Sequence, residues 1–375
     1  MGVANLCVAI VLLSAPPTPP QAVGGNGEWI ELAAMSIARQ ETGAALLEGQ
    51  VFVVSGIVQR FGNRATSTVE VYDVAANLWS LGVALPVALD HMGVAAVDGK
   101  LYVIGGYGGD FVARDEVCMF DPKESKWFAR EPMPGPRGAC WAVAFKDSIF
   151  VFGGVDRLHR ERAETFIYDP LADGWSQGAD MLAAREHLTA VAVGDFIYVI
   201  GGRSGGVALA ANERYDPQSN TWAMMSPMPT ARSATATAAL GAVIMVAGGE
   251  VPMLHAVNEA YNVARDEWIT LEPMPVPRHG VAAVPLGDHI LVPAGGVEQG
   301  FGPTNYVDLF APPRLRGDAN GDFDVDRSDF ADFFDCFGGP GEATAEGCEP
   351  ADVDLDGMVS LADFAMIQDG FTGEF

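Results

Sequence analysis

Residues 185–222 read REHLTAVAVGDFIYVIGGRSGGVALAANERYDPQSNTW, and this stretch decides the fold. It contains four short apolar runs: one of small residues, one that ends in Gly201-Gly202, one that ends in Tyr215-Asp216-Pro217, and one that carries Trp222. Asp-Pro initiates turns, and short apolar runs separated by turn residues are typical of antiparallel strands. The stretch therefore predicts one small four-stranded sheet.

The same pattern recurs along the chain with intervals of 46 to 50 residues. Six apolar runs end in a Gly pair or near-pair, at Ser55-Gly56, Gly105-Gly106, Gly153-Gly154, Gly201-Gly202, Gly248-Gly249 and Gly295-Gly296. Six tryptophans keep step with them, at Trp29, Trp79, Trp127, Trp175, Trp222 and Trp268. Self-similarity at such a period is the signature of repeat architectures, so the chain contains six copies of one sheet.

This order of Gly pair, Tyr-Asp turn and Trp resembles the kelch repeat, over about residues 28–311. The resemblance implies an all-β, six-bladed β-propeller. The composition agrees with a ring, because the first run of each copy is built of small side chains, which suit strands that converge on a narrow axis. The departures are Ser55 for the first Gly, Asn262 for Asp, and a shifted register near Pro293, which leave details of blades one and six open.

The sixth copy has no Trp-bearing run of its own, whereas residues 28–34 around Trp29 precede the first copy. We expect this N-terminal strand to pair into the last blade, because such pairing closes the ring and removes an open sheet edge.

The N-terminus predicts export. Residues 3–15 form an apolar run that is too short for a membrane span, and Pro-rich and small residues follow it. We expect residues 1–22 to be a signal peptide, the protein to be secreted or at the cell surface, and no transmembrane segment to remain after signal removal. The net charge of -27 argues against nucleic acid as a partner.

Four cysteines remain outside the signal peptide. Cys336 and Cys348 flank a Gly-rich loop and are the better candidates for a disulfide, while Cys118 and Cys140 fall in different repeats and are expected to be buried free thiols.

Residues 317–375 hold sixteen acidic residues and one basic residue. Two loops, 34 residues apart, repeat positions 1, 3, 5, 7, 9 and 12 of a calcium-binding loop, with a backbone carbonyl as the ligand at position 7. These positions are Asp318, Asn320, Asp322, Asp324, Asp326 and Asp329 in the first loop, and Asp352, Asp354, Asp356, Met358, Ser360 and Asp363 in the second. The tail is therefore expected to bind Ca²⁺.

Each loop leads into an apolar helical pattern, and the pair resembles a dockerin type I domain. The resemblance implies a small α-helical calcium-binding domain at 317–375, after a linker at 312–316, and a cohesin-like protein as a candidate partner. Dockerins contact cohesins through residues just before position 12 that are usually hydroxylated. Here these are Arg327-Ser328 and Leu361-Ala362, so a calcium-stabilised module without a cohesin partner stays open as an alternative.

Basic residues gather on one predicted face of the ring. In an up-and-down sheet, the segment before the first strand and the loop from the second to the third strand share a face, and 12 of the 22 basic residues fall there. The predicted ligand-binding residues at this mouth are Arg39, His91, Arg137, Arg185, His187, Arg232, Arg278 and His279. Arginine suits bidentate pairing with carboxylates, so an acidic glycan or protein segment is the expected ligand.

Two alternatives concern the same residues. The arginines before the first strands would instead brace adjacent blades by pairing with residues such as Glu131 or Glu272. The three histidines would hold a metal ion, although His279 is out of register and the set has no recognised carboxylate partner.

The sequence thus predicts an extracellular binding module with a calcium-binding domain for attachment or assembly. No catalytic set can be singled out, because acidic residues occur throughout the chain. The enzyme alternative is a sugar-acid isomerase or another carbohydrate-active enzyme, since sialic acid mutarotases share the six-bladed kelch ring and an arginine-lined mouth would suit a sugar acid.

Overall fold

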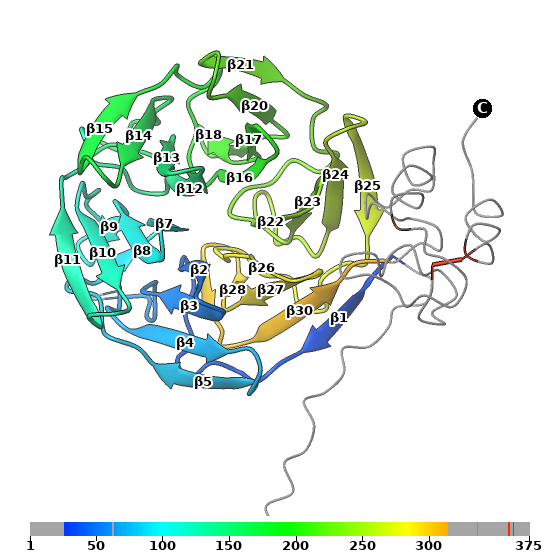
Figure 1. Ribbon diagram of the computed structural model, residues 1–375, viewed down its shortest axis with the longest axis horizontal. Helices are drawn as coiled ribbons and strands as arrows, with labels where there is room; N and C mark the ends of the chain where they lie inside the picture. Colours follow the sequence, from blue (N-terminus) through cyan, green and yellow to red (C-terminus); the bar gives the residue numbers. More distant parts are fainter. Residues whose placement is uncertain (1–25, 62–63, 314–335, 337–358, 361–362, 364–375) are drawn as a thin grey trace, which may run out of the picture.

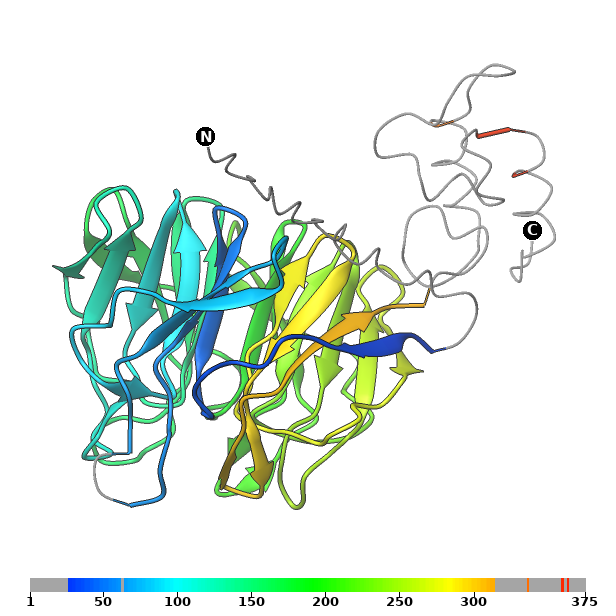
Figure 2. The same cartoon turned by 90° about the horizontal axis from the view of Figure 1, so that it is seen from below.

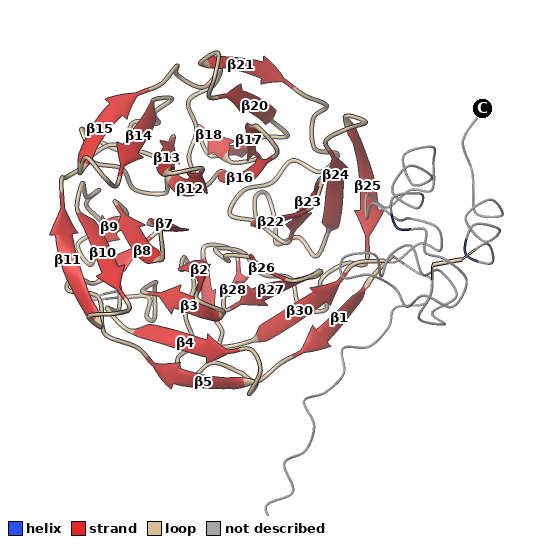
Figure 3. Cartoon of the chain, viewed as in Figure 1, coloured by secondary structure: helices blue, strands red, loops and turns tan. Residues whose placement is uncertain are grey.

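The computed structural model describes residues 26–61, 64–313, 336, 359–360 and 363. Residues 26–61 and 64–313 form a ring of six four-stranded antiparallel sheets, which confirms the six-bladed propeller (Figure 1). The ring consists of strands joined by loops (Figure 3). Among the described residues, no helix is both long and apolar enough to cross a membrane.

The blades follow one another in chain order around the ring, and each runs from an inner to an outer strand. Blade one is β2 (Gly43–Leu47), β3 (Gln50–Val54), β4 (Val69–Asp73) and β5 (Leu78–Leu81); blade two is β7 (Gly93–Val97), β8 (Lys100–Ile104), β10 (Val117–Asp121) and β11 (Lys126–Arg130). Blade three is β12 (Trp141–Phe145), β13 (Ser148–Phe152), β14 (Thr165–Asp169) and β15 (Gly174–Gln177); blade four is β16 (Thr189–Val193), β17 (Phe196–Ile200), β20 (Asn212–Asp216) and β21 (Thr221–Met224).

Blade five is β22 (Ala236–Leu240), β23 (Val243–Ala247), β24 (Asn258–Asn262) and β25 (Glu267–Leu271); blade six is β26 (Val284–Leu286), β27 (His289–Pro293), β30 (Val307–Ala311) and β1 (Glu28–Glu31). Three short ribbons decorate the loops: β6 (Leu89–Asp90) with β9 (Tyr107–Gly108), β18 (Arg203–Ser204) with β19 (Val207–Ala208), and β28 (Gly296–Glu298) with β29 (Phe301–Pro303). In the view of Figure 2 the sheets stand side by side, with connecting loops at both ends of the ring.

The predicted closure of the ring is confirmed. Strand β1 pairs antiparallel with β30, and Trp29 lies opposite Phe310 with the two ring centroids 4.9 Å apart. The N-terminal strand therefore completes the blade that contains the last strands of the ring, and no blade is left with an open gap.

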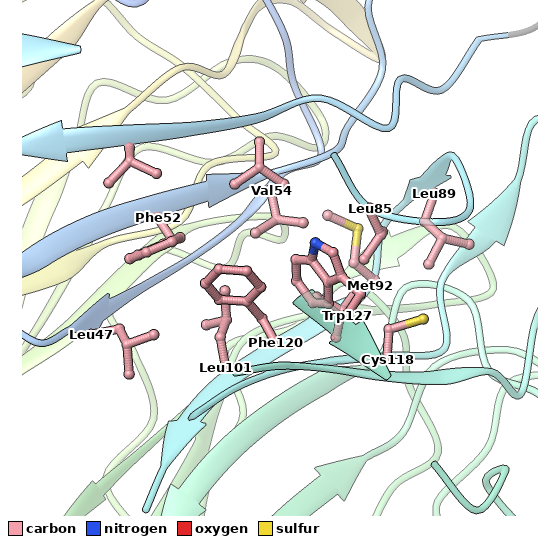
Figure 4. Packing of buried hydrophobic residues seen from close by; sticks show 13 residues of the cluster. Leu47, Phe52, Val54, Leu85, Leu89, Met92, Leu101, Cys118, Phe120 and Trp127 are labelled. Atoms are coloured by element: carbon pink, nitrogen blue, oxygen red, sulfur yellow. The ribbon is translucent and has the colours of Figure 1, made fainter. Parts of the chain in front are cut away.

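The repeated tryptophan joins each blade to the one before it. The Nε1–H group of all six donates to a backbone carbonyl just beyond the outer strand of the preceding blade, at 2.8–2.9 Å. The apolar core likewise lies between blades: Phe52 of blade one packs with Phe120 and Trp127 of blade two (Figure 4). The tryptophan lattice in the sequence therefore marks the contacts that hold neighbouring blades together.

Blade six differs from its prediction by one residue. Ala294 and Gly295 have φ angles of 63° and 105°, close to the 60° and 106° of Ser55 and Gly56 in blade one. The left-handed pair of blade six is therefore Ala294-Gly295, not Gly295-Gly296, because Gly296 already begins strand β28.

The predictions for the two ends of the chain lie largely outside the described residues. Residues 1–22 and all the calcium-loop positions except Ser360 and Asp363 fall there, so the signal peptide and the dockerin-like domain remain predictions. Cys118 and Cys140 are buried free cysteines, as expected. Cys336 takes part in a disulfide.

Candidate functional site

Six residues, one before each inner strand, form a closed ring around the propeller axis. They are Glu41, His91, Ala139, His187, Ala234 and Gly280, and we call them the hub ring. Each has a left-handed φ between 50° and 59°. The N–H of each donates to the carbonyl of the preceding member at 2.7–3.1 Å, and Glu41 closes the circle by donating to Gly280. This conformation is uncommon outside glycine, and the six hydrogen bonds hold it in place.

The five arginines that precede inner strands lie two residues before the hub ring but do not reach the mouth. Arg39, Arg185, Arg232 and Arg278 have no exposed surface, and Arg137 is 4% exposed. Each pairs with a carboxylate of its own blade, and the partners are Glu70, Glu164, Glu213, Glu259 and Asp308. We call these the pre-strand arginines.

These contacts explain why a cation is placed there. Arg185 donates to the carbonyls of Gly201 and Val199, and Arg232 donates to those of Gly248 and Val246. The left-handed glycines turn the chain out of the second strand, and the guanidinium groups bond the carbonyls at this turn. The pre-strand arginines therefore brace the blade, and their burial leaves no guanidinium surface for a ligand.

The bracing differs from the alternative drawn from the sequence, which paired these arginines across blades. Glu131 and Glu272 use their backbone carbonyls to accept hydrogen bonds from tryptophans. The arginine partners lie in the third strand of the same blade or, for Glu164, directly before it. Blade two replaces the pair by two apolar residues, Leu89 and Cys118, which belong to one buried cluster (Figure 4).

The arginines in the loops between second and third strands are mostly neutralised. Arg60 contacts Glu298, Arg114 contacts Asp110, Arg157 contacts Asp115, Arg160 and Arg162 contact Asp156, and Arg203 contacts Glu186 and Glu250. Arg64 differs, because its guanidinium lies 4.7 Å from the centre of the Phe111 ring and its buried Nε has no hydrogen-bond partner among the described residues. The mouth is therefore not the arginine-rich surface that the sequence predicts.

The hub ring opens into a cavity of about 320 Å³ at this mouth. Its charged lining consists of Glu41, Glu161, Glu186 and Glu250 against Arg64 and Arg203. Four carboxylates face two guanidinium groups, so carboxylates outnumber guanidinium groups in the lining, and each protonated histidine offsets one further negative charge. This charge disfavours the acidic ligand expected from the sequence.

Three aromatic rings form one wall of the cavity. Tyr107 and Phe111 stack with centroids 4.2 Å apart, and His159 stacks on Phe111 at 5.8 Å. His91 meets the edge of Tyr107 at 5.2 Å. The lining of the cavity thus combines stacked aromatic rings with four carboxylates.

The three predicted histidines do converge, and they meet a carboxylate. His91 Nε2 lies 3.5 Å from Glu41 Oε2, and His279 Nδ1 lies 3.3 Å from Glu41 Oε1. The rings of His91 and His187 are 4.8 Å apart, edge to face. His279 sits one residue before the hub ring, which confirms that it is out of register with the other two.

The pKa values of this cluster reflect mutual stabilisation of opposite charges. Burial alone would raise the pKa of Glu41, but the neighbouring histidines lower it well below its usual range. Burial opposes protonation of His91 and His279, yet nearby carboxylates raise the pKa of both. For Glu186, burial is outweighed by His187 and Arg203, which lower its pKa to about 2.

Glu41 is the residue that the sequence interpretation missed. It lies 14 residues before Ser55, and His91 and His187 lie 14 residues before their own Gly pairs. This shared position was the available signal, because residues at one lattice position of a closed ring face one axis.

The rim of the mouth carries an exposed apolar side chain from every blade. The six are Phe61, Val112, Leu158, Val207, Met253 and Val297, each from the loop between the second and third strands, with exposed fractions from 36% to 81%. We call this set the apolar rim. All four lysines lie at the opposite face, at the turns or strand starts there.

Comparisons with known proteins show to which family the ring belongs. Residues 90–296 match the model of the KLHDC2/KLHL20/DRC7 Kelch-repeats domain. The chain belongs to the kelch-repeat family. Kelch-like protein 35 of Mus musculus is 40% identical over 120 residues, which are 32% of this chain and 20% of that protein. F-box/kelch-repeat protein At1g67480 of Arabidopsis thaliana is 29% identical over 140 residues, 37% of this chain and 33% of that protein.

The matched part of this chain thus spans between a fifth and a third of the length of these curated relatives. A solved structure described as "Structure of YjhT" aligns with a TM-score of 0.65 at 16% identity, and covers 73% of this chain and 95% of that chain. This likeness shows the same propeller fold.

Proposed function

We propose that this kelch propeller is a protein-binding module whose partner docks on the mouth that carries the apolar rim. The rim is the observation that carries the proposal: six blades each place an apolar side chain at the same face. Loops on a rigid scaffold often carry binding residues, and exposed apolar side chains that gather on one face are typical of interaction sites. Family membership supports the same reading.

The charge of the cavity defines the partner further. The rim surrounds a lining with four carboxylates and two guanidinium groups, and Arg203 is already held between Glu186 and Glu250. Charge complementarity therefore favours a protein segment that covers the rim with apolar side chains and places a basic residue in the mouth.

The test uses a displayed library of random peptides, selected on the immobilised full-length protein. We expect enriched peptides that combine apolar residues with Lys or Arg. Substituting Leu158→Asp and Val207→Asp together in the rim should weaken their binding at least about tenfold, since desolvated apolar contacts carry most interface energy. Leu171→Asp is the matched control, because Leu171 is 98% exposed in a turn at the opposite face.

Peptide binding that survives the rim substitutions, or that is lost equally with Leu171→Asp, would contradict the proposal. A glycan array on the same variants tests the acidic glycan that the sequence also suggests as a ligand. Selective binding of acidic glycans without any peptide binding would replace the protein partner by a carbohydrate.

We also propose that residues 317–375 bind Ca²⁺, on the strength of the two loops in the sequence. Adding a chelator should speed amide hydrogen exchange in this segment while exchange in the propeller strands stays the same. Unchanged exchange in the tail would reject calcium binding there.

A further inference from the structure

We propose that Glu41, His91 and His187 of the hub ring bind one divalent first-row transition-metal ion. The three residues offer one carboxylate oxygen and two imidazole nitrogens, and these ligand atoms all lie within 4.8 Å of one another. Zn²⁺ bonds of about 2.0–2.1 Å in a tetrahedral site place ligand atoms about 3.3 Å apart. The 3.5 Å between Glu41 Oε2 and His91 Nε2 is already close to this spacing.

Both histidines are oriented by a carboxylate behind them. His91 Nδ1 lies 2.6 Å from Asp90 Oδ1, and His187 Nδ1 lies 2.5 Å from Glu186 Oε2. An ionised carboxylate only accepts hydrogen bonds, so Nδ1 of each ring is the donor to it, and Nε2 is the nitrogen that can give its lone pair to a metal ion, with release of any proton that it carries. Carboxylate–histidine pairs of this kind fix the ring and raise its basicity in metal sites.

Glu41 is held from the other side. Its Oε1 faces Nδ1 of His279, whose Nε2 lies 2.9 Å from the carbonyl of Glu298. His279 is fully buried, and its Nδ1 lies 3.3 Å from Glu41 Oε1 and 3.6 Å from Glu250 Oε2, so its ring faces carboxylates of the cluster. This contact leaves Oε2 of Glu41 toward His91, which is the oxygen that the proposed ion would use.

The backbone supports the same site. The three ligands occupy equivalent positions of blades one, two and four, and the hydrogen-bonded hub ring fixes their separation. Sites on such rigid elements keep their geometry better than sites on loops. The other three hub-ring members are Ala139, Ala234 and Gly280, whose small side chains leave room at the centre.

Three protein ligands leave at least one coordination position toward the mouth cavity, which the same three residues line. Open positions are typical of metal sites that bind or activate a further ligand. Arg203 Nη2 lies 3.3 Å from His187 Nε2, and metal binding has to displace this one contact. Other nitrogens of the same guanidinium pair with Glu186 and Glu250, so Arg203 does not depend on His187 for a partner.

The experiment titrates the full-length protein with Zn²⁺ by calorimetry and with Co²⁺ by visible absorption, with excess Ca²⁺ present to saturate oxygen-only sites. We expect one Zn²⁺ per chain at the hub and the absorption of low-coordinate Co²⁺. Glu41→Gln, His91→Asn and His187→Asn should each weaken binding more than about 100-fold, and Asp90→Asn about 10- to 100-fold, as measured for supporting carboxylates elsewhere.

His289→Asn is the matched control. His289 also has a carboxylate neighbour, with Nδ1 2.5 Å from Asp288, but it lies at the opposite face and outside the candidate cluster. Circular dichroism and thermal melting verify that each variant folds. Absence of stoichiometric binding, or binding that persists in folded Glu41→Gln, His91→Asn and His187→Asn proteins, overturns the inference. The rim variants Leu158→Asp and Val207→Asp should leave metal binding unchanged, so this test is independent of the proposed protein partner.

Discussion

At the scale of single residues, polar side chains that lie two positions apart in the chain have different roles in the propeller. The pre-strand arginines point into the blades, where four of them donate to the carbonyl of the left-handed residue that follows the second strand, whereas the hub-ring residues face the axis. A buried ion pair contributes less than its Coulomb attraction suggests, because both charges lose water, but removing one partner leaves the other uncompensated.

The first prediction uses blade two as a natural reference. Arg185→Leu leaves Glu213 buried at 1% exposure without its cation, and should lower the free energy of unfolding by about 3–5 kcal/mol. Adding Glu213→Cys reproduces the pair Leu89 and Cys118 of blade two and should recover part of this loss. Urea unfolding of the single and double variants measures the recovery. A double variant less stable than the single one would show that the blade needs the ion pair itself.

At the scale of elements, the turn between the third and fourth strands links blades one, three, four and five to the blade before each of them. In blade three, Asp173 accepts hydrogen bonds from the Tyr168 hydroxyl and from the backbone N–H of Glu131. In blade four, Asn220 accepts the corresponding bonds from Tyr215 and from Ala179. The residue five positions after the repeated Tyr therefore bridges two blades through its side-chain carboxylate or amide.

The second prediction concerns pH. The hydrogen bond from Tyr168 lowers the pKa of Asp173, and hydrogen bonds outweigh burial to lower that of Asp266. A depressed folded pKa means stabilisation above the unfolded value of about 3.9, lost as pH falls through the folded value. Asn stands at the equivalent positions 77 and 220 of blades one and four. Replacing both Asp173 and Asp266 by Asn should make the melting temperature fall less steeply as the pH drops below about 4. Equal acid sensitivity of wild type and the double variant would exclude this role.

At the scale of the whole molecule, the ring is closed without a covalent link. Only blade six of the described propeller joins strands from opposite ends of the chain, through β1 and β30. The Trp29 indole also donates to the carbonyl of Glu272 in blade five, so one short strand serves both the blade and the joint with its neighbour.

The third prediction tests this closure. Trp29→Ala removes the aromatic contact with Phe310 and the hydrogen bond to Glu272, and should cost about 3 kcal/mol, the lower end for tryptophan, because Trp29 is only partly buried. Trp268→Ala is the control, since blade five is continuous in sequence. We expect Trp29→Ala to be the more sensitive to limited proteolysis, and deletion of residues 28–35 to lower the melting temperature of the entire ring. A melt unchanged by the deletion would argue against closure by β1.

The sequence by itself determined the number of blades, the small inner strands, the closing strand and the face shared by the loops, because each follows from periodicity and the alternation of strand direction. It also placed His91 and His187 at one mouth. The sequence did not identify the left-handed pair of blade six correctly, because Gly295-Gly296 resembles the Gly pairs of the other blades, whereas the left-handed residues are Ala294 and Gly295.

Only the tertiary structure decided which side chains meet. The pre-strand arginines find carboxylates 27 to 31 residues away, in the third strand of their own blade or, for Arg137, directly before it, and so turn away from the mouth. Glu41 reaches His91 and His187 only because the hub ring joins three different blades. Local patterns specify strands and turns, but the polarity of a shared centre depends on side chains brought together by closure of the ring.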